Sequence, residues 1–109
     1  FPTAMHIAAV LGIEDQLIPE MDRLIATFKR LEAENEGVVK SGRTHLQDAT
    51  PIAFSQEISG WRNMIEKTRA QLKLALSGLH ELALGGTAVG TGLNAPKEFG
   101  RKWPPPARN

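Results

Sequence analysis

The sequence predicts an all-α fold built from long helices. Apolar residues recur at intervals of three and four over most of the chain, which is typical of helices that pack against other helices. No stretch alternates with a period of two for long enough to predict a strand. Two long helices, a polar connector between them and a glycine-rich segment after them account for most of the 109 residues.

The first expected helix runs from Thr3, a plausible N-cap, to Gly37, a residue type that commonly ends helices. Two apolar stripes run along it, so we expect it to be covered on two sides. Pro19 removes a backbone donor and crowds the preceding turn, which predicts a kink there. The first stripe comprises Leu17, Met21, Leu24, Phe28 and Leu31, and the second comprises Ile7, Leu11, Ile18 and Ile25.

The second expected helix begins at Thr50 and Pro51, an N-cap followed by proline at the first helical position. Its apolar residues keep a seven-residue phase as far as Leu79, which predicts a rod of roughly 43 Å. Such a rod is longer than a small independent domain needs. Gly78 is a candidate break, after which residues 79–84 form a short helix or a continuation. The apolar positions are Phe54, Ile58, Trp61, Ile65, Leu72, Leu76 and Leu79.

The segment 85-GGTAVGTGLN-94 predicts a loop that turns tightly or closely approaches another chain. It superficially resembles a phosphate-binding loop, but no Gly-Lys-Ser/Thr follows and no strand precedes it, which favours a packing role. Pro96 is placed to open another helix over residues 97–102. Residues 102–109 contain three consecutive prolines and cannot continue a helix. We interpret them as an atypical tail whose native origin is in question.

The composition excludes several classes of protein. The net charge is +1, from 13 basic and 12 acidic residues, so nothing indicates a nucleic-acid or anionic-membrane partner. The longest apolar run, near residues 4–13, is too short to span a membrane. The chain has no cysteine, which excludes disulfides and thiolate chemistry. No histidines or carboxylates have the spacing of a metal site, so we expect no metal.

Of the three histidines, His45 is the candidate for chemistry. His6 lies within an apolar helical stretch, where a packed and hydrogen-bonded ring is expected, and His80 lies near the end of a helix, where its charge would favour the dipole. His45 belongs to the connector 41-SGRTHLQDATP-51, just before an expected helix N-terminus that would attract an anion such as a carboxylate.

The neighbours of His45 suit the same chemistry. Arg43 adds a permanent cation, the hydroxyl of Thr44 can hold a carboxylate or a water, and a neutral imidazole can relay a proton near pH 7. The alternative is that Asp48 and Thr50 only cap the helix while His45 packs. The residues alone leave both interpretations open.

Four segments of the chain resemble class II fumarases, which belong to the fumarase/aspartase superfamily of lyases. They are 1-FPTAMHIAAV-10, 41-SGRTHLQDATP-51, 56-QEISGW-61 and 81-ELALGGTAVGTGLN-94, in family order and with family-like spacing. The resemblance implies that residues 1–101 are part of the central helical domain of such an enzyme, where long helices form a bundle. Residues 102–109 depart from the family.

The resemblance implies fumarate hydratase activity, the reversible hydration of fumarate to L-malate in the tricarboxylic acid cycle, without metal or organic cofactor. It implies that Thr44 binds the dicarboxylate substrate and that His45 orients a catalytic water or exchanges a proton with it. Aspartases resemble this region but carry glutamine in place of His45. The alternatives are a related lyase, such as argininosuccinate lyase, or a helical oligomerisation module without catalysis.

The resemblance also implies a homotetramer whose sites are shared between subunits, in the cytoplasm, or in mitochondria if the source is eukaryotic. We expect the chain to be an internal fragment. The family's Ser-Ser-Asn-Asp stretch would lie just before Phe1. The loop with the serine base, and the Lys and Asn that hold a substrate carboxylate, would follow Asn109. We therefore expect the isolated chain to be inactive or nearly so.

Overall fold

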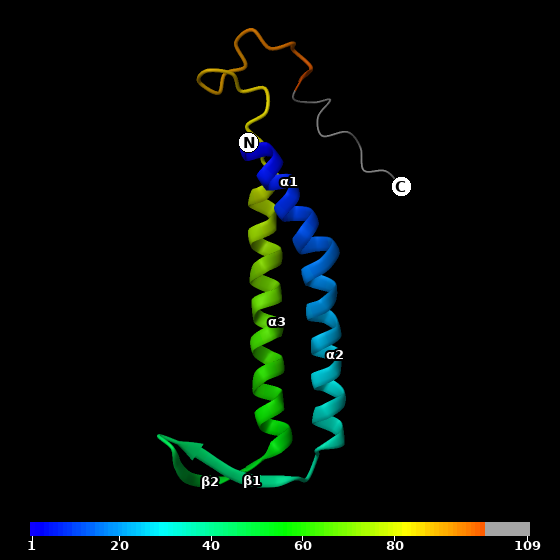
Figure 1. Cartoon of the computed structure of the whole chain (residues 1–109), viewed down its shortest axis with the longest axis vertical. Helices are drawn as coiled ribbons and strands as arrows, with labels where there is room; N and C mark the ends of the chain where they lie inside the picture. The colour runs from blue at the N-terminus through cyan, green and yellow to red at the C-terminus, as the bar shows by residue number, and fades with distance from the viewer. Residues whose placement is uncertain (100–109) are drawn as a thin grey trace.

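The computed structural model describes residues 1–99. Its helices α2 and α3 lie side by side and antiparallel, with a two-stranded sheet at one end of the pair (Figure 1). The helix α1 and the segment after α3 lie at the other end. The predicted all-α class is therefore confirmed for the bulk of the described chain, with one small sheet added. The elements are α1 (Pro2–Gly12), the π-helix η1 (Ile13–Leu17), α2 (Ile18–Glu34), β1 (Val39–Thr44), β2 (Gln47–Ala53) and α3 (Phe54–Leu79).

The first helix is continuous but changes its hydrogen-bonding pattern before Pro19. Proline has no N–H to bond the carbonyl four residues earlier, and its ring crowds that carbonyl. The chain adjusts by forming η1, where the N–H of Ile18 bonds the carbonyl of Ile13, five residues back. The direction of the helix changes in this region (Figure 1). The irregularity predicted at Pro19 is confirmed, whereas the helix begins at Pro2 instead of after Thr3.

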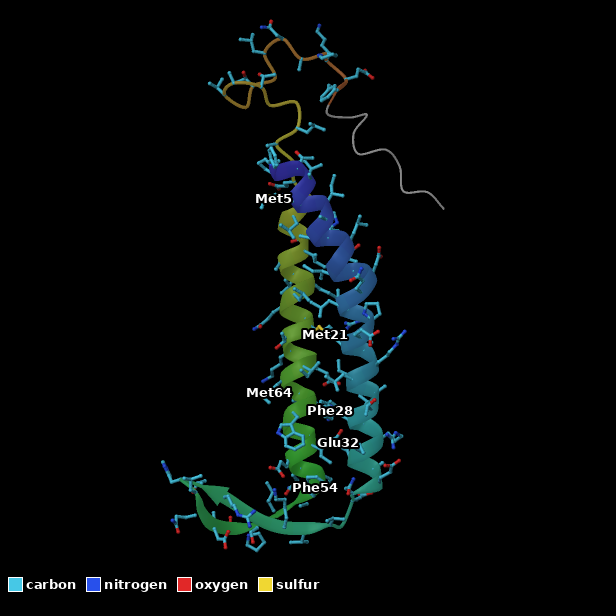
Figure 2. All side chains as sticks on the ribbon, viewed as in Figure 1. Met5, Met21, Phe28, Glu32, Phe54 and Met64 are labelled. Atoms are coloured by element: carbon cyan, nitrogen blue, oxygen red, sulfur yellow. The ribbon has the colours of Figure 1, made fainter. Side chains whose placement is uncertain are left out.

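The core lies along the interface between α2 and α3. Its buried members are Ile18, Ile25, Ile58 and Leu76. Met21 and Phe28 extend into the same interface (Figure 2), and the rings of Phe28 and Trp61 have centroids 6.3 Å apart. The α3 stripe expected from the sequence faces this interface. Of the first-helix stripes, Leu17 and Leu24 are 46% and 41% exposed, so the described residues 1–99 do not provide the expected cover on a second side.

Ion pairs flank the apolar interface. Arg62 on α3 lies 2.6 Å from a carboxylate oxygen of Glu32 on α2 and 2.9 Å from Glu66. Arg69 donates to Asp22 at 2.9 Å. The hydrogen bond from Arg62 lowers the pKa of Glu32, and the hydrogen bond to Glu32 raises the pKa of Arg62. These charges fix how α2 and α3 face one another.

The connector between the helices is a β-hairpin, which corrects two predictions. β1 and β2 are antiparallel strands, although no strand was expected, and Pro51 lies in β2 opposite Ser41. The helix α3 begins at Phe54, three residues after the predicted start. Its N-terminus is capped by Gln56, whose side-chain oxygen accepts the N–H of Ala53 at 3.1 Å. Pro51 belongs to a strand because it is paired with Ser41 of β1, and Thr50 precedes it in the same strand.

The segment after α3 is a loop, as predicted. The helix passes through Gly78 and ends at Leu79, so residues 80–84 neither continue it nor form a short helix of their own. Gly85, Gly90 and Gly92 have φ values of +84°, +82° and +74°, which glycine adopts readily and other residues rarely do. Residues 100–102 of the helix expected over 97–102, and the tail at 102–109, lie outside the described residues. Among residues 1–99, no helix is long and apolar enough to cross a membrane.

Candidate functional site

The two site residues predicted from the sequence lie at the tip of the β-hairpin. Thr44 ends β1 and is paired with Gln47, the first residue of β2, so the turn contains only His45 and Leu46. Both turn residues have left-handed backbones, with φ values of +50° and +61°. Positive φ at both central residues is the requirement of the two-residue type I′ turn, whose twist matches that of the flanking strands. The turn therefore presents Thr44 and His45 side by side and exposed.

His45 lies farther from a helix start than its place in the sequence predicts. We expected His45 immediately before a helix N-terminus, but the whole of β2, Gln47–Ala53, separates it from α3. The free amides and partial positive charge of a helix start act within about one turn of that start. The α3 terminus therefore does not provide the anion-attracting charge that we had assigned to it beside His45.

A cross-strand ion pair closes the hairpin directly behind the turn. Arg43 and Asp48 are opposite each other in the register, and the Nε of Arg43 lies 3.0 Å from the Oδ1 of Asp48. We expected Arg43 to add a permanent cation near His45, and the alternative interpretation gave Asp48 the role of a helix cap. The structure pairs them with each other, so the guanidinium is partly neutralised and both side chains restrain the ends of the strands.

The base of the hairpin is anchored on the start of α3. Lys40 of β1 lies 2.7 Å from a carboxylate oxygen of Glu57, and its ammonium is 5.8 Å from the centroid of the Phe54 ring. The backbone N–H of Phe54 donates to the carbonyl of Val38 at 2.8 Å. These contacts orient the hairpin with respect to the helix pair.

A hollow of about 530 Å³ lies beside the hairpin and includes Thr44 in its lining. Two threonine hydroxyls and two cationic side chains contribute to it, and each cation has a carboxylate partner within the chain. A hydroxyl at this place can donate to a carboxylate. His45 follows Thr44 in the chain but is not among the residues that line the hollow. Among residues 1–99, no group of three or more His, Cys, Asp or Glu side chains could hold a metal. The lining residues are Lys40, Gly42, Arg43, Thr44, Ala49, Thr50, Ile52 and Glu57.

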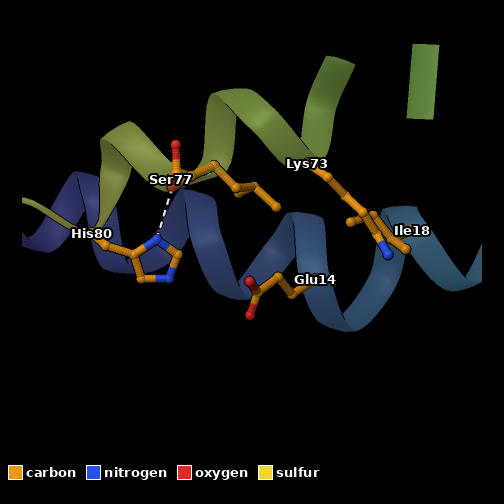
Figure 3. Close-up of a pocket in the computed structure, with 6 residues that line it drawn as sticks. Glu14, Ile18, Lys73, Ser77 and His80 are labelled. Carbon is orange, nitrogen blue, oxygen red and sulfur yellow. Dashed lines mark hydrogen bonds between the residues drawn. The ribbon is translucent and has the colours of Figure 1, made fainter. Parts of the chain in front are cut away.

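The other two histidines lie at the opposite end of the molecule. His80 follows α3, and its Nδ1 donates to the carbonyl of Leu76 at 2.9 Å, beside a hollow of about 490 Å³ that includes Glu14 and Lys73 (Figure 3). The Nδ1 of His6 lies 3.1 Å from the carbonyl of Glu81. Both rings are held by backbone carbonyls, in agreement with the structural roles expected for them.

The sequence matches a known protein family over almost its whole length. A family described as "Lyase" matches residues 1–103. The chain belongs to this lyase family.

Within the family, the chain is similar to class II fumarate hydratases. It is 55% identical over 102 residues to the one from Oceanobacillus iheyensis, 53% identical over 102 residues to one from Helicobacter pylori and 51% identical over 100 residues to the one from Bacillus subtilis. These matches cover 92–94% of this chain and 22% of each relative. The chain thus spans about a fifth of the length of the curated relatives that it matches.

Solved structures agree with the sequence relatives. The recombinant class II fumarase from Schistosoma mansoni superposes with a TM-score of 0.85 at 40% identity, covering 91% of this chain and 21% of that one. A fumarate lyase:delta crystallin from Brucella melitensis, bound to cobalt, gives a TM-score of 0.82 at 37% identity, covering 93% of this chain and 22% of that one. The helix pair and the hairpin therefore belong to an architecture found in larger enzymes.

Proposed function

We propose that this chain is part of a fumarate hydratase, which adds water reversibly to fumarate to give L-malate. The observation that carries the proposal is the 51–55% identity to class II fumarate hydratases over almost the whole chain. The exposed Thr44–His45 turn supports it, because the reaction requires a carboxylate to be held beside a group that can exchange a proton with water. The whole protein would then act in the tricarboxylic acid cycle, in the cytoplasm, or in mitochondria if its source is eukaryotic.

In the proposed reaction, the hydroxyl of Thr44 donates to one substrate carboxylate. His45 orients the reacting water or exchanges a proton with it, and no cofactor takes part. Charge that builds on the substrate must be stabilised by further donors, and within this chain Lys40 and Arg43 already have carboxylate partners. A site shared between the subunits of a homotetramer would bring in those donors and the base. We therefore expect the isolated chain to be inactive or nearly so.

Transfer of this segment into a complete enzyme tests the proposal. The matching 102 residues of the Oceanobacillus iheyensis enzyme are replaced by this sequence, and hydration is followed by the loss of fumarate absorbance. We expect the chimera to be active and His45→Asn to lower kcat by about 10²–10⁴-fold, the usual contribution of a proton-transfer group. The tetramer and the melting temperature should not change.

The control is His80→Asn, which removes a histidine at the far end of the helix pair and leaves an amide donor for the Leu76 carbonyl. It should retain the activity of the chimera. Equal activity of His45→Asn and the unchanged chimera would contradict the proposal and favour a helical module without chemistry.

A further inference from the structure

The register of the hairpin changes by one residue between its base and its tip. Near the base, Ser41 is paired with Pro51, whereas near the tip Arg43 is paired with Asp48. One residue of β1, Gly42, therefore lies opposite two residues of β2, Ala49 and Thr50. This arrangement is a β-bulge, in which the extra residue of one strand is left without a partner.

The bulge depends on glycine at position 42. A Cβ built on Gly42 would lie 2.7 Å from the backbone carbonyl oxygen of Thr50, closer than such atoms approach in proteins. The obstacle is backbone, so it cannot rotate away as a side chain would. Any other residue at position 42 must shift the strands.

The bulge also determines the length of the turn. If the register at Ser41 and Pro51 continued without the extra residue, Thr44 would be opposite Asp48 and the turn would contain the three residues 45–47. With the bulge, Thr44 is paired with Gln47 and the turn contains two. The same shift places Arg43 opposite Asp48, where their side chains form the ion pair.

We propose that Gly42 is a positioning residue for the candidate site, because the bulge that only glycine permits sets the two-residue turn that presents Thr44 and His45. This inference rests on the proposed function for its effect on activity, and on the register alone for its effect on structure. Bulges beside active sites commonly change the direction in which a side chain points. Displacement of a catalytic group by about 1 Å can lower a rate by about 100-fold.

The test uses Gly42→Ala in the full-length chimera described above. We expect kcat for fumarate to fall by about 100-fold with an unchanged melting temperature, since the hairpin lies at the end of the helix pair. Deleting Ala49 in the same variant removes the extra residue of β2. It leaves Arg43 opposite Asp48 and Thr44 opposite Gln47, and we expect it to restore most of the activity. Ser41→Ala, which precedes the bulge, is the matched control and should behave like the unchanged chimera.

Two outcomes would overturn the inference: Gly42→Ala with activity within about twofold of the unchanged chimera, or failure of the Ala49 deletion to restore any activity. Crystal structures of the variants give a second reading that does not depend on the substrate. Gly42→Ala should show Thr44 no longer paired with Gln47, and the deletion should restore that pair. A chimera that is inactive on fumarate would instead contradict the proposed function, while the pairing would still decide the role of Gly42.

Discussion

At the scale of single residues, the turn at the hairpin tip is held in a conformation that its side chains disfavour. Leu46 has a φ of +61° and is 99% exposed, so no packing offsets its left-handed backbone. The left-handed conformation costs a residue with a Cβ roughly 1–2 kcal/mol, whereas glycine adopts it freely but loses more entropy on folding. We therefore expect Leu46→Gly to stabilise the hairpin by about 0.5–1 kcal/mol. Amide hydrogen exchange of the β1 and β2 residues, compared between the unchanged chain and Leu46→Gly, measures the change in stability.

The control for Leu46→Gly is Leu74→Gly, at another exposed leucine, 75% accessible, in the interior of α3. Glycine at position 74 should destabilise the helix by about 1 kcal/mol, because glycine has a low helix propensity and Leu74 has no left-handed backbone whose strain glycine could relieve. Lower protection of the hairpin in Leu46→Gly than in the unchanged chain would show that the leucine is not strained.

At the scale of elements, the helices were predictable and the hairpin was not. The apolar residues from Phe54 to Leu79 recur at a spacing that places them on one face only in a helix, and this face includes the buried Ile58 and Leu76. β1 and β2 are mostly exposed and carry polar residues on both faces, so they show no alternation. Pro51 is unusual within a strand and common at a helix start, which explains why α3 was predicted three residues early.

The candidate site was predictable only in part, because some of its features depend on the pairing of β1 with β2. Thr44 and His45 were identified by residue type and by resemblance, and the structure places them together at one turn. The roles assigned to them stay predictions. The pairing of Arg43 with Asp48 and the need for Gly42 depend on a register between strands that the sequence pattern did not reveal. Cross-strand relations of this kind require the fold before they can be seen.

The ion pair between α2 and α3 predicts a pH dependence of stability. Glu32 has a pKa below its ordinary value because Arg62 donates hydrogen bonds to its carboxylate. A carboxylate whose folded pKa is lowered stabilises the folded state at every pH above its unfolded pKa, about 4.3. That stabilisation disappears as the pH falls from about 4.3 through the lowered pKa. We expect the urea midpoint of helix unfolding to fall more steeply over this acid range in the unchanged chain than in Glu32→Gln.

The control for Glu32→Gln is Glu34→Gln. Glu34 pairs with Arg30 one helical turn away, and both side chains are more than half exposed. Such surface pairs contribute little, so Glu34→Gln should follow the acid profile of the unchanged chain. Coincident profiles for the unchanged chain and Glu32→Gln would show that the Arg62 contact does not stabilise the helix pair.

At the scale of the whole molecule, the chain forms a single layer of helices. Its extents are 69 × 35 × 16 Å, and its radius of gyration is 22.5 Å, against about 13 Å for a compact domain of this length. The accessible surface is 8821 Å², whereas a compact monomer of 11.9 kDa would expose about 6,000 Å². Stable domains bury their helices between at least two packed layers. Leucines 17, 24 and 74 are among the apolar side chains that this single layer leaves exposed.

This exposed surface predicts that the isolated chain associates with copies of itself. Burial of apolar area between two copies is the main favourable contribution to the free energy of association. The charges oppose association little, because the net charge is only +1. Sedimentation velocity should give a mass that is a multiple of 11.9 kDa. The combined changes Leu17→Gln, Leu24→Gln and Leu74→Gln should shift the chain toward the monomer while circular dichroism still reports helix.

The matched control for the leucine changes is Val89→Gln, at a residue that is 78% exposed but lies in the segment after α3, away from the helix pair. Because it removes an exposed apolar side chain from outside the helical layer, it should leave the mass unchanged. A monomeric unchanged chain, or an equal shift in Val89→Gln, would contradict association through the helix faces. If association depends on those leucines, the single helical layer of this chain packs against a second helical layer from another copy, as the helices of a shared bundle do.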